Sequence, residues 1–268
     1  MMEYHYRFGM EENPFLKNSK EILFEADEFK EAQTRLNYLQ TTKGFGILTG
    51  SAGKGKTTAI RVWTRGLNPS LYKVVYSSLS TLTVTEFYRN LASGLGLMPR
   101  YRKPDNFRLI QDEITRYAVE KRITPVIIID EANHISNGIL NDLKILFNFD
   151  MDSRDRAIIL LAGLPQLNYT LNLGIHEPLR QRITMNYNME GLSKDESKRY
   201  IQTKLLGVHC TQQVFDENAL EAIANAANGI PRLLNKLANS CLMIANARSL
   251  DRVDSDIVMQ AVNDCQLG

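Results

Sequence analysis

The sequence predicts a three-layer α/β fold with a parallel sheet between helices, followed by a small all-helical domain. Up to about residue 190, short and continuously apolar runs alternate with longer segments of helical period. This pattern is typical of a parallel sheet covered on both faces. From there to Gly268 no strand signal appears. We therefore expect an N-terminal segment and helix packing on the core over residues 1–45, an α/β core over 46–189 and a helical lid over 190–268.

Four apolar runs and a weaker fifth one are expected to form the strands of the core. They are Phe45–Thr49, Tyr72–Ser77, Val126–Asp130, Ile158–Ala162 and, as the weaker one, Ile183–Asn188. Apolar residues at helical spacing predict helices between these strands. The expected helices are Glu28–Gln40, Thr57–Arg65, Val84–Leu95 and Phe107–Lys121.

The lid begins with Ser193-Lys-Asp-Glu196, in which the serine and the glutamate have the spacing of a capping box. A second helix is expected over Asp216–Ala227, where apolar residues recur at helical spacing. Asn228-Gly229 would end that helix, because both residue types tolerate a left-handed backbone. Pro231 can then occupy the first turn of a third helix.

Composition excludes several classes of protein. The 268 residues carry a formal net charge of +2, with 23% charged and 44% hydrophobic residues. These values exclude a disordered tail protein, a collagen-like chain, a disulfide scaffold and a uniformly basic nucleic-acid binder. The cysteines, Cys210, Cys241 and Cys265, form no C-x-x-C pair, so reduced thiols are expected. No signal peptide or long apolar run is found, which predicts a cytoplasmic protein without a membrane segment.

Charge is distributed unevenly near the N-terminus. Residues 1–31 are acidic, whereas residues 32–75 contain no acid and seven lysines and arginines. One interpretation is that the basic stretch faces an anionic ligand. The alternative, that these charges are solvated separately on different faces, is equally open.

Residues Gly50–Thr57 match the pattern G-x-x-x-x-G-K-[ST] between a predicted strand and a predicted helix. Glycines allow the backbone N–H groups to encircle phosphate oxygens, and the helix adds its positive N-terminal end. Lys56 would reach the β- and γ-phosphates, and the Thr57 hydroxyl would bind Mg²⁺. The candidate phosphate-binding residues are Gly50, Ser51, Ala52, Gly53, Lys54, Gly55, Lys56, Thr57 and Thr58.

A buried strand that ends in two acids, Val126–Glu131, is the expected second half of this site. Asp130 would hold the Mg²⁺ shell, and Glu131 would orient and deprotonate an attacking water. Two acids favour hydrolysis over storage of the nucleotide. Asn235-Lys236 is followed by Leu237-Ala238, not by the pattern of a guanine-binding site, so ATP is the expected nucleotide.

At this point the chain resembles the AAA+ ATPases, and within them the ExeA-like ATPases and the transposition helpers of the TniB and TnsC type. The resemblance covers nearly the whole chain. It is carried by Phe8-Gly9, Asn13-Pro14-Phe15, Lys43–Gly50, Ile129-Asp-Glu-Ala-Asn133, Leu179-Arg-Gln-Arg-Ile183 and Gly229-Ile-Pro-Arg232.

The resemblance implies roles for three arginines and an aromatic residue. Arg182 stands where an arginine finger would act on a neighbouring subunit's nucleotide, with Arg180 beside it. Arg232 resembles the second sensor, and Phe15 falls in a region that lies near the adenine in that family. The alternative is that the arginines only pair with surface acids.

One position departs from the family. Where the first sensor is expected, at the end of the fourth strand, this chain has Gly163-Leu164-Pro165-Gln166, with leucine at the polar position. Gln166 or Asn168 could substitute for the missing group. Otherwise hydrolysis would be slow or would depend on a partner.

A basic cluster is the candidate DNA contact. Arg100, Arg102 and Lys103 surround Tyr101, and Thr83 lies in the same predicted region. Lysine and arginine bind phosphates, and hydroxyls can add hydrogen bonds. A solvated loop is the alternative interpretation.

The resemblance implies that ATP binds at the subunit interfaces of a homo-oligomeric ring or helical filament on double-stranded DNA. This assembly would select a target and recruit or activate a transposase. The chain stops after the lid, without the membrane and cell-wall-binding regions of secretion ATPases, which favours this hypothesis. An ExeA-like secretion-linked or regulatory ATPase that acts on proteins without DNA is the alternative, and a switch that scarcely hydrolyses ATP is a third. The transposase, the target sequence and the subunit number are not indicated by the sequence.

Overall fold

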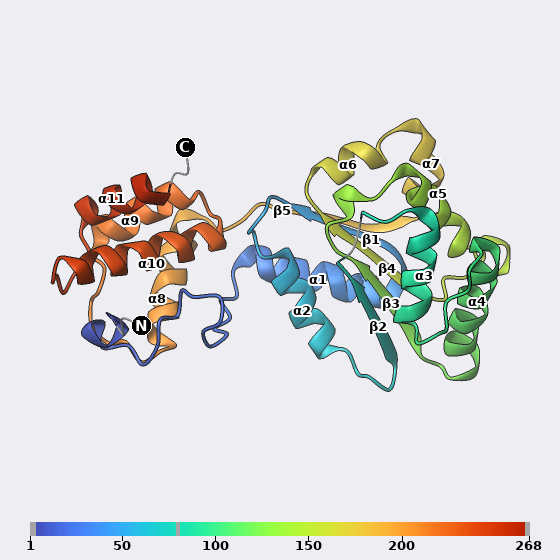
Figure 1. Ribbon diagram of the computed structural model, residues 1–268, viewed down its shortest axis with the longest axis horizontal. Helices are drawn as coiled ribbons and strands as arrows, with labels where there is room; N and C mark the ends of the chain where they lie inside the picture. The colour runs from blue at the N-terminus through green and yellow to red at the C-terminus, as the bar shows by residue number, and fades with distance from the viewer. Residues whose placement is uncertain (1–3, 79–80, 266–268) are drawn as a thin grey trace. The chain divides into compact units, whose positions relative to one another are not determined.

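The computed structural model describes residues 4–78 and 81–265 and divides the chain into two compact units (Figure 1). The sheet unit consists of residues 31–52 and 56–189, and the helical unit of residues 1–30, 53–55 and 190–268. The boundary between residues 189 and 190 falls at the position expected for the start of the lid. The expected N-terminal segment 1–45 is itself divided, because residues up to Lys30 group with the helical unit.

The sheet unit contains five strands in the order β2-β3-β4-β1-β5, and every neighbouring pair is parallel. The strands are β1 (Gly44–Gly50), β2 (Tyr72–Ser77), β3 (Thr124–Ile129), β4 (Ile158–Gly163) and β5 (Ile183–Met189). All residues of β1 and β4 are buried, as expected for central strands of a covered parallel sheet. The predicted α/β class is therefore confirmed, including the weak fifth strand.

Helices cover both faces of this sheet (Figure 1). On one face lie α1 (Asp27–Thr42) and α2 (Lys56–Gly66), and α1 packs so closely that a Cβ on Gly46 would stand 2.3 Å from Leu39. The other face carries α3 (Val84–Gly94), α4 (Lys103–Thr115) and α5 (Asn137–Leu146). Alternate strand residues, such as Ile127 and Ile129, form one core with these helices.

Shorter helices complete the sheet unit. They are η2 (Arg116–Glu120), η3 (Ala132–His134), η4 (Asp150–Asp152), α6 (Gln166–Leu171), η5 (Gly174–His176) and α7 (Glu177–Arg180). Because the strands are parallel, their carboxyl ends meet at one edge of the sheet and their amino ends at the other. These two edges, the carboxyl edge and the amino edge, carry the polar sites described below.

The helical unit is built from η1 (Tyr4–Phe8), α8 (Lys194–Leu206), α9 (Glu217–Ala227), α10 (Pro231–Ala247) and α11 (Ser255–Cys265). Ser193 and Glu196 form the predicted capping box at the start of α8. Asn228 ends α9 with a left-handed backbone, φ 46°, and Pro231 occupies the first turn of α10. The predicted helical lid is therefore present.

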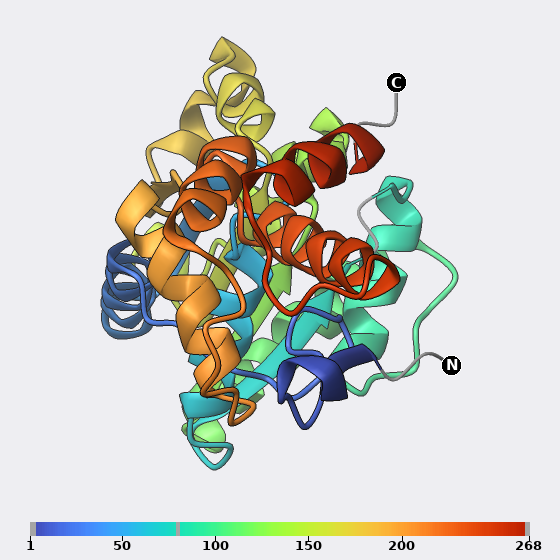
Figure 2. The same ribbon diagram turned by 90° about the vertical axis from the view of Figure 1, so that its left-hand side faces the viewer.

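The N-terminal segment packs against these helices (Figure 2). The Tyr4 hydroxyl and the Asn13 amide both donate to the side-chain oxygen of Asn239 on α10, each at 2.7 Å. The Asn13 oxygen accepts from the Phe15 amide at 2.9 Å, and the Phe15 ring packs edge-on against Phe215. Asn13 thereby fixes this segment to α10. Among the described residues no helix is long and apolar enough to cross a membrane.

Candidate nucleotide-binding site

The predicted phosphate loop lies between the end of β1 at Gly50 and the start of α2 at Lys56. Gly53 and Gly55 have φ values of 81° and 99°, a region that side chains with a Cβ rarely adopt. The loop therefore needs glycine at these positions to turn into the helix. The first N–H groups of α2 lack partners inside the helix and are available to a phosphate at its N-terminus.

Lys56 is held inside this loop by backbone oxygens. Its Nζ donates to the carbonyls of Gly50 at 2.7 Å and Ser51 at 3.1 Å, and the residue is only 8% exposed. An ammonium group fixed in the loop is positioned to bind a phosphate oxygen there. Of the other candidate residues, Ser51, Lys54, Gly55 and Thr58 are half-buried, and Ala52 and Thr57 are exposed.

Asp130 follows β3 and brings the two halves of the predicted site together. Its amide donates to the Ser77 carbonyl at 2.9 Å, which continues the pairing with β2 and keeps the residue 4% exposed. Its Oδ2 accepts from the Thr57 hydroxyl at 3.1 Å and from the Tyr76 hydroxyl at 2.8 Å. Its Oδ1 accepts from the Glu131 amide at 2.9 Å.

This donor set fits a magnesium ion. Mg²⁺ prefers oxygen ligands, and proteins often hold it with one or two side chains while phosphate and water supply the rest. Thr57 and Asp130 offer a hydroxyl and a carboxylate in contact. Among the described residues no group of three or more His, Cys, Asp or Glu side chains could hold a metal by itself. The hydroxyl of Thr57 and the carboxylate of Asp130 fit a Mg²⁺ ion whose other ligands come from phosphate and water.

Tyr76 is a site residue that sequence reasoning missed. Burial and the neighbouring carboxylate of Asp130 raise the pKa of Tyr76 to about 12, so its phenol is protonated and donates the hydrogen bond. A tyrosine on an edge strand looks like an ordinary strand former. Only the pairing of β2 beside β3 reveals its contact.

Glu131 has a left-handed backbone, φ 53°, directly after the buried aspartate. A positive φ is uncommon outside glycine and is often found where structure serves a site. The residue is exposed, so its carboxylate can meet a water. The predicted pair thus has one buried and one exposed member.

At the missing first sensor, the Asn168 side chain donates to the Thr49 hydroxyl at 3.0 Å, and Thr49 donates to Asn188 at 3.1 Å. Thr49 is fully buried and precedes the phosphate loop by one residue. Asn168 therefore lies at the carboxyl edge, whereas Gln166 is exposed. Thr49 and Asn188 were not anticipated.

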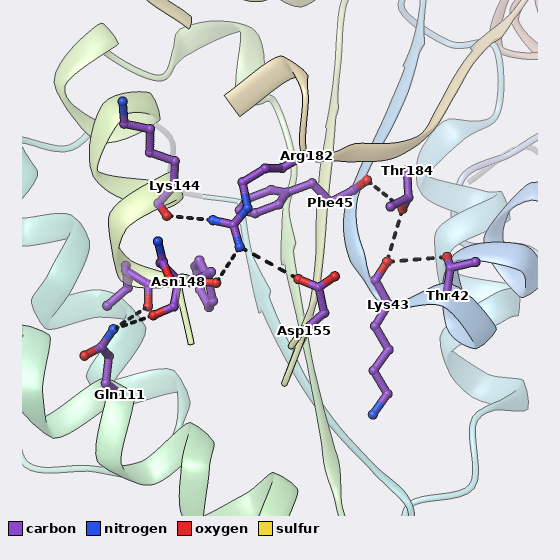
Figure 3. Close-up of polar contacts among 11 residues, drawn as sticks. Thr42, Lys43, Phe45, Gln111, Lys144, Asn148, Asp155, Arg182 and Thr184 are labelled. Carbon is purple, nitrogen blue, oxygen red and sulfur yellow. Dashed lines mark hydrogen bonds and ion pairs between the residues drawn. The ribbon is translucent and has the colours of Figure 1, made fainter. Parts of the chain in front are cut away.

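The guanidinium of Arg182, the expected finger, is engaged within its own chain (Figure 3). Nη1 donates to the Lys144 carbonyl at 2.7 Å and Nη2 to the Phe147 carbonyl at 2.9 Å, both at the end of α5. Asp155 lies 3.8 Å away, and the Phe45 ring lies under the guanidinium. A side chain held this way fastens the amino edge together and cannot extend to a neighbour without breaking these contacts.

Arg180 and Arg232 are both exposed. Arg180 makes a single 3.2 Å hydrogen bond to the Asn172 carbonyl. Within the helical unit, the Arg232 amide donates to the Gly53 carbonyl at 3.4 Å. A Cβ on Gly53 would stand 2.8 Å from the Cβ of Arg232, so this contact also requires glycine.

Phe15 does not have the environment of a base-contacting residue. It is 5% exposed and belongs to the apolar core of the helical unit. Thr83 caps α3 through reciprocal hydrogen bonds with Glu86, and Lys103 forms a 2.6 Å ion pair with Asp142 beside the Tyr88 ring. These two candidate DNA contacts are therefore engaged within the chain.

Arg100 and Arg102 are exposed, as predicted for a phosphate-binding loop. The fully buried Asn106 accepts from the Arg100 amide at 2.7 Å and donates to the carbonyls of both arginines. The loop is thus held rigidly while its arginine side chains are exposed. Arg108, which was not anticipated, lines a shallow hollow with Arg100, Asp105 and Asp112.

A phosphate loop at the end of the central strand β1, with an Asp-Glu pair at the end of β3 on the far side of β4, defines a P-loop nucleoside-triphosphatase fold. Residues 39–171 match the AAA domain family. The chain belongs to the AAA+ ATPases, as its resemblance to the ExeA-like and TniB–TnsC group predicted.

The chain is 32% identical over 262 residues to "General secretion pathway protein A" of Aeromonas hydrophila, which covers 95% of this chain and 47% of that protein. It is 24% identical over 254 residues to "ATP-dependent target DNA activator B" of Escherichia phage D108, which covers 91% of this chain and 73% of that protein. The chain thus spans about half the length of the Aeromonas relative.

Solved structures share the fold. Cdc6p from Pyrobaculum aerophilum has a TM-score of 0.72 at 15% identity, covering 95% of this chain and 71% of its own. The Drosophila ORC bound to DNA has a TM-score of 0.73 at 16% identity, covering 99% and 66%. At these identities the likeness concerns the fold alone.

Proposed function

We propose that this chain binds and hydrolyses ATP with Mg²⁺ at subunit interfaces, assembles on double-stranded DNA, and there selects a target and recruits or activates a transposase. The observation that carries the proposal is the meeting of Thr57 with Asp130 beside the glycine loop that holds Lys56. The similarity to a phage target-DNA activator over 91% of the chain supports the DNA part.

In the proposed reaction the loop amides and Lys56 bind the phosphates, and Thr57 and Asp130 would hold the metal with its nucleotide. Bound Mg²⁺ would neutralise charge on the phosphate oxygens. Glu131, exposed beside the buried Asp130, orients a water and accepts its proton as that water bonds to the γ-phosphorus. The bond from the γ-phosphorus to the β–γ bridging oxygen breaks, so that ADP and inorganic phosphate leave. Asn168 takes the place of the first sensor through Thr49.

We place the arginine finger at Arg180 and not at Arg182. Arg180 is exposed with one long hydrogen bond, whereas Arg182 is held by two carbonyls. The segment that precedes Arg180 carries exposed apolar side chains: Tyr169, Leu173 and Ile175 are 74%, 50% and 56% exposed. Exposed apolar groups on the segment that leads to an exposed guanidinium support a surface for a second copy of the chain. Arg232 remains the proposed second sensor.

For DNA we propose phosphate contacts by Arg100 and Arg102, with Arg108 as an addition. The loop is held by Asn106, so its arginines lose little freedom on binding. Tyr101 between them is 89% exposed and can stack or donate to the backbone. Phosphate contacts of this kind carry no base specificity.

The test is fluorescence anisotropy of a labelled duplex, titrated with the protein and either a slowly hydrolysed ATP analogue or ADP, at two salt concentrations. The proposal expects cooperative binding with the ATP analogue, weaker binding at high salt and little binding with ADP. The double variant Arg100→Ala with Arg102→Ala should lose binding, whereas Arg252→Ala in the helical unit should retain it. Absence of DNA binding with both nucleotides would refute the DNA part.

The second candidate is a secretion-linked or regulatory ATPase that acts on proteins without DNA. The 32% identity to a general secretion pathway protein over 95% of the chain favours it. Vesicle flotation distinguishes the two proposals: membrane association without DNA binding would favour the second. A third candidate, a switch that scarcely hydrolyses ATP, is tested by turnover that disappears in Glu131→Gln.

A further inference from the structure

The Asp130 carboxylate has an uneven set of hydrogen-bond partners. Oδ2 accepts two bonds, from Tyr76 at 2.8 Å and Thr57 at 3.1 Å, and Oδ1 accepts one, from the Glu131 amide at 2.9 Å. An ionised carboxylate has about four acceptor positions, two on each oxygen. Oδ2 is therefore fully used, and the remaining acceptor position belongs to Oδ1.

The two donors to Oδ2 come from different elements, and only one of them, Thr57, is also a proposed metal ligand. Thr57 lies in the first turn of α2, next to the phosphate loop, and its hydroxyl oxygen is a proposed metal ligand. Tyr76 belongs to the edge strand β2, next to β3, and its phenol has no comparable duty toward the metal. The shorter bond, from Tyr76, can hold the carboxylate whatever the threonine does.

The surroundings of Tyr76 fit such a role. The residue pairs in register with Ile128, two positions before Asp130, so the ring reaches along the strand direction to the carboxylate. Its neighbour Val75 is buried in the core on the opposite face, while Tyr76 itself is 50% exposed. The tyrosine therefore contributes little to core packing, and its contact with Asp130 is the distinctive one.

We propose that Tyr76 is a positioning residue that fixes the orientation of the Asp130 carboxylate for binding of the metal–nucleotide pair. This inference rests on the proposed role of Asp130 in holding Mg²⁺. Groups that hydrogen-bond to a metal's carboxylate commonly set its affinity, and their loss weakens binding about 10–100-fold. Tyr76 is expected to lie at the lower end of that range, because Thr57 and Glu131 also restrain the carboxylate.

The test is Tyr76→Phe, which keeps the ring and removes only the hydroxyl. Binding of Mn²⁺, as a stand-in for Mg²⁺, is titrated by electron paramagnetic resonance in the presence of ADP. The variant should bind Mn²⁺ about 10-fold more weakly than the wild type. Its affinity for a fluorescent ADP analogue in EDTA should be unchanged, because the hydroxyl acts only through the metal site. A general loss of structure would instead weaken both Mn²⁺ binding and metal-free ADP binding. Tyr72→Phe, at the other end of the same strand, is the matched control and should match the wild type.

Equal Mn²⁺ affinity in Tyr76→Phe and the wild type would overturn the inference while leaving the metal site in place. Equal weakening of Mn²⁺ binding and of metal-free ADP binding would also overturn it, because the tyrosine would then support the fold of the site. A wild-type chain that binds ADP but no Mn²⁺ would instead refute the proposed metal site itself. These outcomes separate failure of the inference from failure of the proposed function.

Discussion

At the carboxyl edge of the sheet, Thr57 and Tyr76 share one oxygen of Asp130, and the next residue, Glu131, is exposed. At the amino edge, the Arg182 guanidinium donates hydrogen bonds to the carbonyls of Lys144 and Phe147 (Figure 3). Both edges gather charged side chains from separate elements. The carboxyl edge retains a hydrogen-bond acceptor position on Asp130 and the exposed carboxylate of Glu131. At the amino edge the guanidinium of Arg182 is hydrogen-bonded to carbonyls of its own chain. Residue type alone therefore does not distinguish a functional site from a contact that only stabilises the fold.

Substitutions can test this difference between the two edges. Changes at the carboxyl edge should alter ATP turnover, whereas changes at the amino edge should alter the stability of the fold. The largest effect is expected for Glu131→Gln. Loss of a general base typically costs about 10²–10⁴-fold in rate. The variant should still bind ATP and fold normally, as measured by steady-state turnover beside nucleotide binding. Turnover near the wild-type rate would remove Glu131 from the mechanism.

Lys56→Ala should weaken binding of a fluorescent ATP analogue about 100-fold, because a charge-assisted hydrogen bond to phosphate is worth about 1.5–3 kcal/mol. Lys54→Ala is the matched control in the same loop and should bind more tightly than Lys56→Ala. Binding that is equally strong in the two variants would contradict the assignment of Lys56.

Arg182→Ala should lower the free energy of unfolding by about 2–4 kcal/mol, because it leaves two carbonyls without their charged donor. Arg180→Ala should change it by less than about 0.5 kcal/mol and should instead lose assembly-dependent ATP turnover. Urea denaturation and turnover at rising protein concentration measure the two effects. The opposite pattern would return the finger to Arg182.

Asn168→Ala should slow turnover about 10-fold with little change in ATP affinity, because it removes the donor to Thr49 beside the phosphate loop. Gln166→Ala, at an exposed position of the same helix, should leave turnover unchanged. If Gln166→Ala slows turnover and Asn168→Ala does not, the first sensor lies at Gln166.

The smallest expected effect concerns His176, which is 1% exposed and hydrogen-bonded to Asn137. Burial lowers the pKa of His176, with a smaller contribution from Lys144. The folded state therefore disfavours the protonated ring, so its contribution to stability is present above the unfolded pKa and is lost as pH falls below it. The free energy of unfolding should fall from pH 7.5 to 5.5, and less steeply in His176→Gln. His134→Gln, at an exposed position, should retain the wild-type slope.

The sequence was sufficient for the strands and for the phosphate loop, because burial on both faces and glycine-dependent turns leave local patterns. Continuous apolar runs marked β3 and β4, and the capping box marked the start of α8. The fold class followed from these patterns alone. The N-terminal segment was less accessible, since its grouping with the helical unit depends on contacts with Asn239, more than 200 positions away.

The parts of the site that escaped prediction depend on pairing between distant elements. Tyr76 meets Asp130 only because β2 lies beside β3, and Thr49 meets Asn168 across a separation of 119 positions. Arg182 carried the motif expected of a finger, but a motif does not show which carbonyls lie within reach. Lys103 was expected to contact DNA, and no pattern in the sequence indicates that Asp142 lies beside it.

The hydrogen bonds from Tyr4 and Asn13 to Asn239 have a consequence for how the chain is made. This segment finds its partner only after α10 has been synthesised, so it stays undocked while the sheet unit emerges from the ribosome. Domains commonly fold as units during synthesis, and here the helical unit combines segments that precede and follow the sheet unit in the sequence. A substitution at Asn13 should therefore delay completion of the helical unit and leave folding of the sheet unit unaffected.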